Sequence, residues 1–353
     1  MRIILPISLL ILLLTLLLPL LLVSSPEWEE EGDGEAPEEQ DNVHPVRNPP
    51  LLLDNQGENE TAGVLDERIL LQVLVGEEVQ EMTMAAYLQG VVAAEMPARF
   101  HPEALKAQAV AARTYTLHRM LVAPTARHPE AYVCGDYACC KAYHNRERLR
   151  ERWGGNYSRY SEIIARAVAE TDGLILSYEG LPILAAFHAA SYGFTEASGA
   201  IWGEVPYLQS VRTFEGVQEV PGYYTTVKLT FAEFREIALT FPGVSLPEDK
   251  IPYWISNVTR TDSGRIASLN LGGAEVSGAE FRRLFSLRST AVTFAFDGTH
   301  ISLTTGGHGH GVGMSQFGAN TLAEIGLEFN QILDWYYTGV TLVRVDSLFP
   351  PAG

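Results

Sequence analysis

A glycine-rich segment near the carboxyl end of the chain carries side chains suited to chemistry. Gly306 to Ala319 reads Gly-Gly-His-Gly-His-Gly-Val-Gly-Met-Ser-Gln-Phe-Gly-Ala. Glycine permits positive φ and close approach of backbone to a ligand, so this run is typical of a tight loop that presents imidazoles and N–H groups. Composition alone leaves three interpretations open: a metal site on His308 and His310, a structural turn, and a polar loop that binds substrate. The substrate-binding residues would be His308, His310, Ser315 and Gln316.

All three cysteines of the chain are clustered within seven residues, at Cys134, Cys139 and Cys140. His128 precedes the first of them by six positions, so the four side chains predict a Cys₃His tetrahedral zinc site in a loop. A disulfide from Cys134 to one of the other two cysteines is an alternative, because we expect this part of the chain to be exported, and free thiols are another. The odd number of cysteines favours the metal.

Glu95 is the candidate acid. It lies in the last turn of a short apolar helix that Thr83 caps and Pro97 ends, because the proline keeps Met96 out of helical geometry. The negative end of the helix dipole and apolar neighbours both raise the pKa of such a carboxylate. The position therefore suits a general acid, and the alternative is a surface glutamate at a frayed helix end.

A second helix, rich in alanine, is predicted from Pro102 to about Met120. Its small residues allow close contact with other helices. From this helix, the long side chain of Arg113 is within reach of Glu95 or a bound anion. The alternative for Arg113 is an ordinary solvent-facing arginine.

A polar loop follows a predicted strand pair, 174–178 and 181–187. The second strand delivers His188 into a segment with Ser191, Thr195 and Glu196, which has little reason to exist as a packing element. We expect these four residues to bind substrate. A serine nucleophile with a histidine base is the less favoured alternative, because no Gly-x-Ser-x-Gly elbow is present and no acid partner can be assigned.

The remaining patterns indicate an α+β fold, in which helical segments pack with β-rich elements. Short alternating runs predict a β-rich lobe around 215–300 with one or two helices. The other expected elements are a strand from 69 to 75, helices at 160–170 and 329–337, and a strand at 340–345.

The amino-terminal part differs sharply in composition from the rest. Residues 1–23 are almost wholly apolar and long enough to cross a bilayer, so we expect a transmembrane anchor, with a cleaved signal peptide as the alternative. Residues 24–66 hold 13 Asp or Glu and one basic residue, Arg47, which predicts a disordered acidic linker. The extracytoplasmic catalytic region is then 67–353. A net charge of −18 and a pI of about 4.9 argue against nucleic acid as a partner.

Four segments, taken together, resemble one known family. They are Val91-Val-Ala-Ala-Glu-Met-Pro97, Gln108-Ala-Val-Ala-Ala-Arg-Thr-Tyr115, the loop from His188 to Ser198, and Gly309 to Ala319. In this order they match the pattern of the stage II sporulation protein D family, and the match spans most of the chain after about residue 68. The loop reads His-Ala-Ala-Ser-Tyr-Gly where that pattern has His-Ser-Thr-Ser-Gly-Gly.

The resemblance implies a membrane-anchored lytic transglycosylase that cleaves peptidoglycan strands stripped of their peptides, to 1,6-anhydro ends, during engulfment of the forespore. It implies an amidase and a small membrane protein as partners, and it supports zinc at the cysteine cluster. Glu95 matches the catalytic glutamate of the family. The residues that the resemblance places along the sugar cleft are Arg113, His188, Ser191, His310 and Gln316.

The sequence is also compatible with two other functions. One is a non-catalytic wall-binding module that enhances an amidase. The other is a zinc hydrolase that uses His308 and His310.

Overall fold

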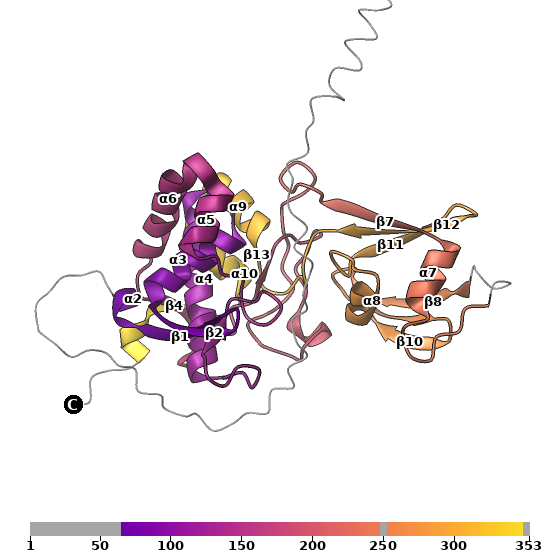
Figure 1. The fold of residues 1–353 in the computed structure, drawn as a ribbon, viewed down its shortest axis with the longest axis horizontal. Helices are drawn as coiled ribbons and strands as arrows, with labels where there is room; N and C mark the ends of the chain where they lie inside the picture. The colour runs from indigo at the N-terminus through magenta and orange to yellow at the C-terminus, as the bar shows by residue number, and fades with distance from the viewer. Residues whose placement is uncertain (1–64, 248–252, 349–353) are drawn as a thin grey trace, which may run out of the picture. The chain divides into compact units, whose positions relative to one another are not determined.

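The computed structural model describes residues 65–247 and 253–348, all of which belong to one unit of the chain, 33–353 (Figure 1). The expected anchor, 1–23, and the acidic segment up to residue 64 lie outside the described residues. Leu65 and Asp66, at the end of the expected linker, form the start of a short helix, α2 (Leu65–Arg68). Within the described ranges, no helix has both the length and the apolar character needed to cross a bilayer.

Local signals set the boundaries of the helix that carries Glu95. The strands β1 (Leu70–Val75) and β2 (Glu78–Thr83) pair antiparallel. The hydroxyl of Thr83 then accepts a hydrogen bond from the N–H of Ala86 at 3.2 Å and begins α3 (Met84–Glu95). Met96 is extended, with φ −124° and ψ 142°, as expected for a residue before proline. The predicted cap and stop are confirmed, and Glu95 is the last residue of α3.

The helix α4 (Pro102–Leu121) forms the centre of the helical part. Every residue from Ala107 to Leu121 is buried. Its alanines bring the neighbouring elements close to its axis, and in Figure 1 the carboxyl-terminal helices α9 and α10 lie beside it although more than 190 residues separate them in sequence. The elements packed on α4 are α3, α6 (Tyr157–Ala169), α9 (Gln316–Glu324), α10 (Phe329–Tyr336), β3 (Val133–Cys134), β4 (Leu174–Tyr178) and β5 (Leu181–Pro182).

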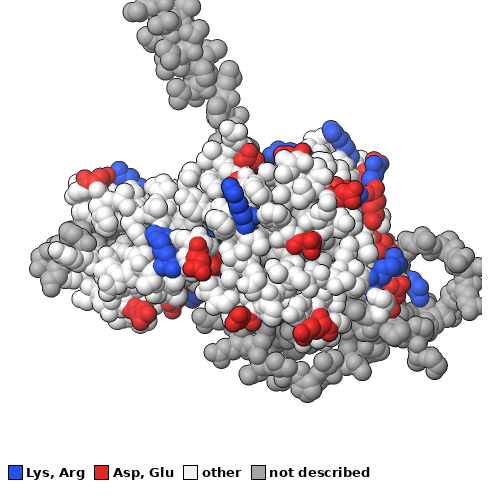
Figure 2. All heavy atoms as spheres, turned by 180° about the vertical axis from the view of Figure 1, so that it is seen from behind, with Lys and Arg blue, Asp and Glu red and all other residues white. Residues whose placement is uncertain are grey.

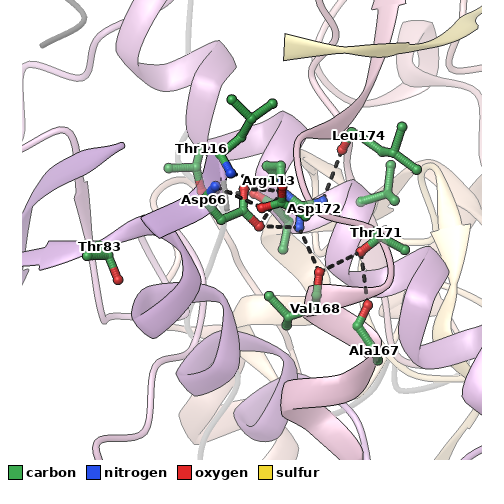
Figure 3. A network of polar contacts seen from close by, with 12 residues as sticks. Asp66, Thr83, Arg113, Thr116, Ala167, Val168, Thr171, Asp172 and Leu174 are labelled. Atoms are coloured by element: carbon green, nitrogen blue, oxygen red, sulfur yellow. Dashed lines mark hydrogen bonds and ion pairs between the residues drawn. The ribbon is translucent and has the colours of Figure 1, made fainter. Parts of the chain in front are cut away.

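A buried ion pair joins α4 to the start of the described chain (Figure 3). The guanidinium of Arg113 donates to both carboxylate oxygens of Asp66 at 2.6–3.0 Å, and to the carbonyl of Leu174 at 3.0 Å. Asp172 accepts from the backbone N–H groups of Leu65 and Asp66 at 2.9 and 2.8 Å. Arg113 is fully buried, so this structure corrects the expected contact with substrate: its donors are used inside the protein.

Short strands complete the helical part. The predicted strand 181–187 is instead two pieces, β5 and β6 (Phe187–His188), since Pro182 lacks the N–H that a longer ladder requires. β4 pairs antiparallel with β5 and with β14 (Thr341–Arg344), while β3 (Val133–Cys134) pairs parallel with β1. The other elements of this part are α5 (Arg146–Trp153) and the 3₁₀ turns Gly154–Asn156, Ser198–Ala200 and Val345–Leu348.

The expected β-rich region has a hydrophobic core of its own, in which Phe234, Trp254, Phe281 and Phe285 are buried. The rings of Phe234 and Phe285 stack at 4.6 Å. Two three-stranded antiparallel sheets form this lobe, in the orders β11-β12-β7 and β10-β9-β8. Its elements are β7 (Tyr224–Thr230), α7 (Phe231–Ala238), β8 (Ile255–Arg260), β9 (Ile266–Leu271), β10 (Ala274–Ser277), α8 (Gly278–Leu284), β11 (Val292–Phe296) and β12 (His300–Gly306).

A short parallel ladder joins two segments that lie on either side of this lobe in sequence. β6 pairs with β13 (Met314–Ser315), so that Phe187 faces Met314 and His188 faces Ser315. Isolated bridges extend the contact from Ala190 to His308 and from Glu196 to Val312. The histidine loop and the glycine-rich segment are therefore held side by side, next to the first residue of α9.

Charged side chains are interspersed on the face drawn in Figure 2. Lys and Arg side chains lie among Asp and Glu side chains there, and neither sign forms a continuous patch on that face.

Candidate active site

Glu95 accepts two hydrogen bonds from segments that are distant in sequence. The backbone N–H of Ala142 donates to its Oε1 and the side-chain amide of Gln316 donates to its Oε2, each at 3.0 Å. Burial raises the pKa of Glu95 above its usual 4.5, although the nearby Lys141 charge and the two hydrogen bonds act in the opposite direction. The side chain is only partly buried, so it combines a raised pKa with access to a ligand.

Gln316 is positioned by the start of α9. Ser315 caps this helix by accepting from the N–H of Gly318 at 3.3 Å, and its own hydroxyl donates to Glu215. Gln316 follows as the first helical residue. Its amide nitrogen donates to Glu95 and, at 3.4 Å, to the Gln108 side chain on α4. The glycine-rich segment, which the resemblance places along the sugar cleft, thus contacts Glu95 through Gln316.

His188 is a neutral imidazole with both ring nitrogens engaged. Its Nδ1 lies 3.2 Å from the Val312 carbonyl, which can only accept, so Nδ1 carries the proton and Nε2 accepts from the Ser191 hydroxyl at 2.6 Å. Burial, followed by the charge of Arg265, lowers the pKa of His188 to about 3. Ser191 is fully buried and already donates this bond, which leaves no exposed nucleophile in the pair.

His310 is the partly buried histidine that faces the same region. Its Nδ1 accepts from the N–H of Val312 at 3.0 Å, so the proton of the neutral ring is on Nε2. Burial lowers the pKa of His310 well below 6.5. Its ring centre lies 4.9 Å from that of Trp202 and 5.6 Å from that of His188. His310 therefore offers a neutral N–H donor beside an aromatic face.

The glycines of this segment allow its close packing. Gly311 has φ 89°, and a Cβ there would lie 2.6 Å from the guanidinium carbon of Arg265, which is itself buried. Gly313 has φ 72°, and a Cβ there would lie 2.0 Å from the carbonyl oxygen of Ala186. Any other residue at either position would force the segment away from its support.

Thr195 and Glu196 bind other parts of the protein. Both are buried. The Thr195 hydroxyl accepts from the N–H of Val211 at 2.8 Å. Glu196 Oε2 accepts from the hydroxyls of Thr261 and Ser263 at 2.6 and 2.7 Å, in the turn between β8 and β9. The expected substrate contacts are therefore replaced by a brace between this loop and the β-rich lobe.

Two further residues, Glu215 and Lys141, were not expected from the sequence. Glu215 is buried and accepts from the Ser191 N–H at 2.8 Å as well as from the Ser315 hydroxyl, so it holds both loops of the site. No sequence motif marks it. Lys141 lies near Glu95, with its ammonium 3.8 Å from the ring centre of Phe187 and 4.5 Å from that of Tyr115. Lys141 directly follows Cys140, so its place next to the cysteine cluster is visible in the sequence.

The four predicted metal ligands come together. The ligand atoms of His128, Cys134, Cys139 and Cys140 all lie within 4.8 Å of one another, and no disulfide joins the cysteines. The His128 Nδ1 donates to the Ala131 carbonyl at 2.9 Å, which turns the unprotonated Nε2 toward Cys140 Sγ, 3.3 Å away. One imidazole and three sulfur donors in this arrangement fit a tetrahedral Zn²⁺.

The histidines of the glycine-rich segment are not part of such a cluster. Across residues 65–247 and 253–348, the group of at least three potential ligands that could share an ion is the one around Cys140. His308 is partly buried, and its backbone pairs with that of Ala190 in both directions, at 3.0 and 2.7 Å.

Comparison with known proteins places this arrangement in a family. Residues 76–178 match the family model described as stage II sporulation protein. The chain is 36% identical over 271 residues to stage II sporulation protein D of Bacillus amyloliquefaciens, an alignment that covers 76% of each protein. It is 35% identical over 273 residues, or 77% of each protein, to stage II sporulation protein D of Bacillus subtilis strain 168.

The chain belongs to the stage II sporulation protein D family. A third relative is the amidase enhancer of Bacillus subtilis strain 168, with 30% identity over 306 residues, which cover 72% of this chain and 40% of the relative. The segment that matches the stage II sporulation protein family model includes α3, α4 and the cysteine cluster. Glu95 and Lys141 lie within it, whereas His188 and Gln316 lie beyond it.

Proposed function

We propose that this protein is a lytic transglycosylase that cleaves peptide-free peptidoglycan strands to 1,6-anhydro ends. The observation that carries the proposal is Glu95, a partly exposed carboxyl group with a raised pKa, held by the Gln316 amide and the Ala142 N–H. A raised pKa keeps the proton on the acid near neutral pH. The relationship to the stage II sporulation protein D family supports the same chemistry.

One carboxyl group is enough for this reaction. Glu95 transfers its proton to the glycosidic oxygen as the bond from this oxygen to the anomeric carbon breaks, and positive charge develops on the sugar ring. The sugar's own C6 hydroxyl then bonds to the anomeric carbon and returns a proton to the Glu95 carboxylate. Atoms and charge balance without water. The two N–H donors stabilise Glu95 while it is ionised, and the neutral N–H of His310 is available to a sugar hydroxyl.

The test is the product formed by the Glu95→Gln variant. Full-length protein is incubated with peptide-free glycan strands, and anhydro ends are counted by mass spectrometry. Loss of a general acid lowers rates by about 10²–10⁴-fold. Glu147→Gln, in an exposed glutamate on α5, is the matched control and should keep the wild-type rate. Undiminished anhydro products from Glu95→Gln would rule out this acid.

The second candidate function is enhancement of an amidase, which the 30% identity to a protein named amidase enhancer favours. A module of this kind binds the wall or the amidase and needs no acid. In a coupled assay with a cell-wall amidase, Glu95→Gln would then stimulate as well as wild type. If Glu95→Gln no longer stimulates the amidase, the stimulation by wild type results from strand cleavage.

We also propose Zn²⁺ as a structural ion at His128 and the three cysteines. The ion would cross-link the loop between α4 and α5. The two residues that follow Cys140 are Lys141 and Ala142, and Ala142 donates to Glu95. An ion bound to His128 and the thiolates would therefore help to position the Ala142 N–H, which donates to Glu95.

The setting implied by the family resemblance completes the proposal. Residues 1–23 anchor the protein in the cell membrane with 67–353 outside the cytoplasm, where it works with an amidase and a small membrane protein during engulfment of the forespore. Fractionation of sporulating cells tests the anchor: full-length protein should sediment with membranes, and a chain that starts at residue 24 should not.

A further inference from the structure

Lys141 presents an unpaired ammonium beside the candidate acid. In the part of the chain that the structure describes, its Nζ makes no hydrogen bond or ion pair, and its contacts are the faces of Tyr115 and Phe187. The side chain is partly buried, and the two aromatic rings fix the place of its ammonium. Three N–H donors held by two aromatic rings form a site for an anion.

The neighbouring charges do not neutralise this ammonium when substrate binds. Among the neighbouring groups, Glu95 and Cys140 can carry negative charge, and Arg119 adds a second positive charge. Glu95 must be protonated to act as an acid, so it is neutral until it donates to the glycosidic oxygen. The Cys140 sulfur is a candidate metal ligand, and a bound cation would share its negative charge. In the substrate complex the ammonium therefore lacks a full counter-charge.

A substrate that brings its own negative charge supplies the missing counter-charge. Muramic acid carries a lactyl group on C3, two ring carbons from the anomeric carbon. With a peptide attached, that group is a neutral amide. After the peptide has been removed it is a free carboxylate, of the size and charge that an ammonium binds with charge-assisted hydrogen bonds.

We propose that Lys141 binds the lactyl carboxylate of the muramoyl residue at the scissile bond, and so makes the enzyme select strands without peptides. This inference rests on the proposed transglycosylase function. Other polar groups near the acid do not offer the same recognition: His310 is a neutral donor, and Arg113 is buried against Asp66. Lys141 is thus a specificity residue, distinct from the acid.

The test compares two strands that differ only at the lactyl group. One is the peptide-free strand, and the other is the same strand with its carboxylates converted to methylamides. Full-length wild-type protein should cleave the carboxylate strand with a kcat/KM about 10- to 100-fold higher, as expected for one charge-assisted contact. Lys141→Met should lower that ratio to near one, and Lys141→Arg should keep most of it. Lys228→Met, on the β-rich lobe and paired with Asp297, is the control and should leave the ratio unchanged.

Several results would overturn the inference. Equal cleavage of the two strands by wild type would contradict it. A preference for the carboxylate strand that is unchanged in Lys141→Met would also contradict it. Zinc content and melting temperature of each variant are measured alongside, because Lys141 adjoins Cys140. If Lys141→Met loses zinc, the inference is judged on two other results. These are the ratio of the kcat/KM values for the two strands in wild type, and whether Lys141→Arg keeps that ratio.

Failure of the proposed function gives a different pattern. Wild type then cleaves neither strand, and binding of both strands is measured in the Glu95→Gln protein. Preferential binding of the carboxylate strand that disappears in Glu95→Gln/Lys141→Met supports recognition by Lys141 without catalysis. Equal binding of the two strands refutes it.

Discussion

Replacing Arg113 with methionine separates a structural role of this arginine from a role in binding substrate. The guanidinium is fully buried and makes bonds of 2.6–3.0 Å to Asp66, which is itself 2% exposed. Methionine keeps much of the length and the apolar contacts of the side chain while removing the charge. The Asp66 carboxylate is then buried without its partner, and the Leu174 carbonyl loses a donor.

The expected loss of stability is large. Removing one partner of a buried ion pair costs about 3–5 kcal/mol, because the remaining charge is stranded away from water. For a folded region of more than 200 residues, each kcal/mol lowers the melting temperature by about 2–4 °C, so the shift is about 6–20 °C. Adding Asp66→Asn to Arg113→Met should recover part of this loss, since the stranded charge is gone.

Thermal and urea unfolding of the full chain measure these differences. Arg166→Met is the control, since Arg166 makes an exposed pair with Glu162 that is worth at most about 1 kcal/mol. Below its melting temperature, Arg113→Met should still cleave glycan strands. A variant that unfolds like wild type but no longer cleaves would refute this reasoning and return Arg113 to the substrate site.

Three further predictions follow from the site. Activity should fall as pH rises through the raised pKa of Glu95. The free energy of unfolding should fall over the same interval above 4.5, because the folded state binds that proton more tightly than the unfolded state. Unfolding of Glu95→Gln measured against pH should show no such loss. Removing zinc with a chelator should lower the melting temperature, and Cys140→Ser should lower it without chelator. If mass spectrometry shows that zinc has been lost and the melting temperature is unchanged, a structural ion is excluded. Glu215→Leu leaves the Ser191 N–H and the Ser315 hydroxyl without an acceptor, at a cost of about 1–3 kcal/mol each. It should therefore lower both the free energy of unfolding and the cleavage rate. Wild-type values for both would show that Glu215 does not hold the loops.

Features of the fold with local causes could be predicted from the sequence. Thr83 and Pro97 set the ends of α3 because a cap and a proline act on their immediate neighbours. The spacing of the cysteines also brought the four candidate ligands together, since all of them lie in one loop.

Partners distant in sequence could not be predicted in this way. Arg113 and Glu196 are polar residues in plausible positions for substrate binding, yet Asp66 and the hydroxyls of the β8–β9 turn engage them. Which buried group receives a polar side chain depends on the complete fold. Lys141 combines both cases: its place directly after Cys140 is visible in the sequence, but its proximity to Glu95 depends on the complete fold.

The pairing of β7 with β12 gives the chain a modular topology. Tyr224 lies opposite Gly306, so the polypeptide leaves for the lobe and returns from it at neighbouring positions. Hairpins at the far end of that lobe can therefore lengthen, shorten or carry a grafted peptide without rethreading the rest of the molecule. The turn containing Thr261 and Ser263, which grips Glu196, is the part that such changes must preserve.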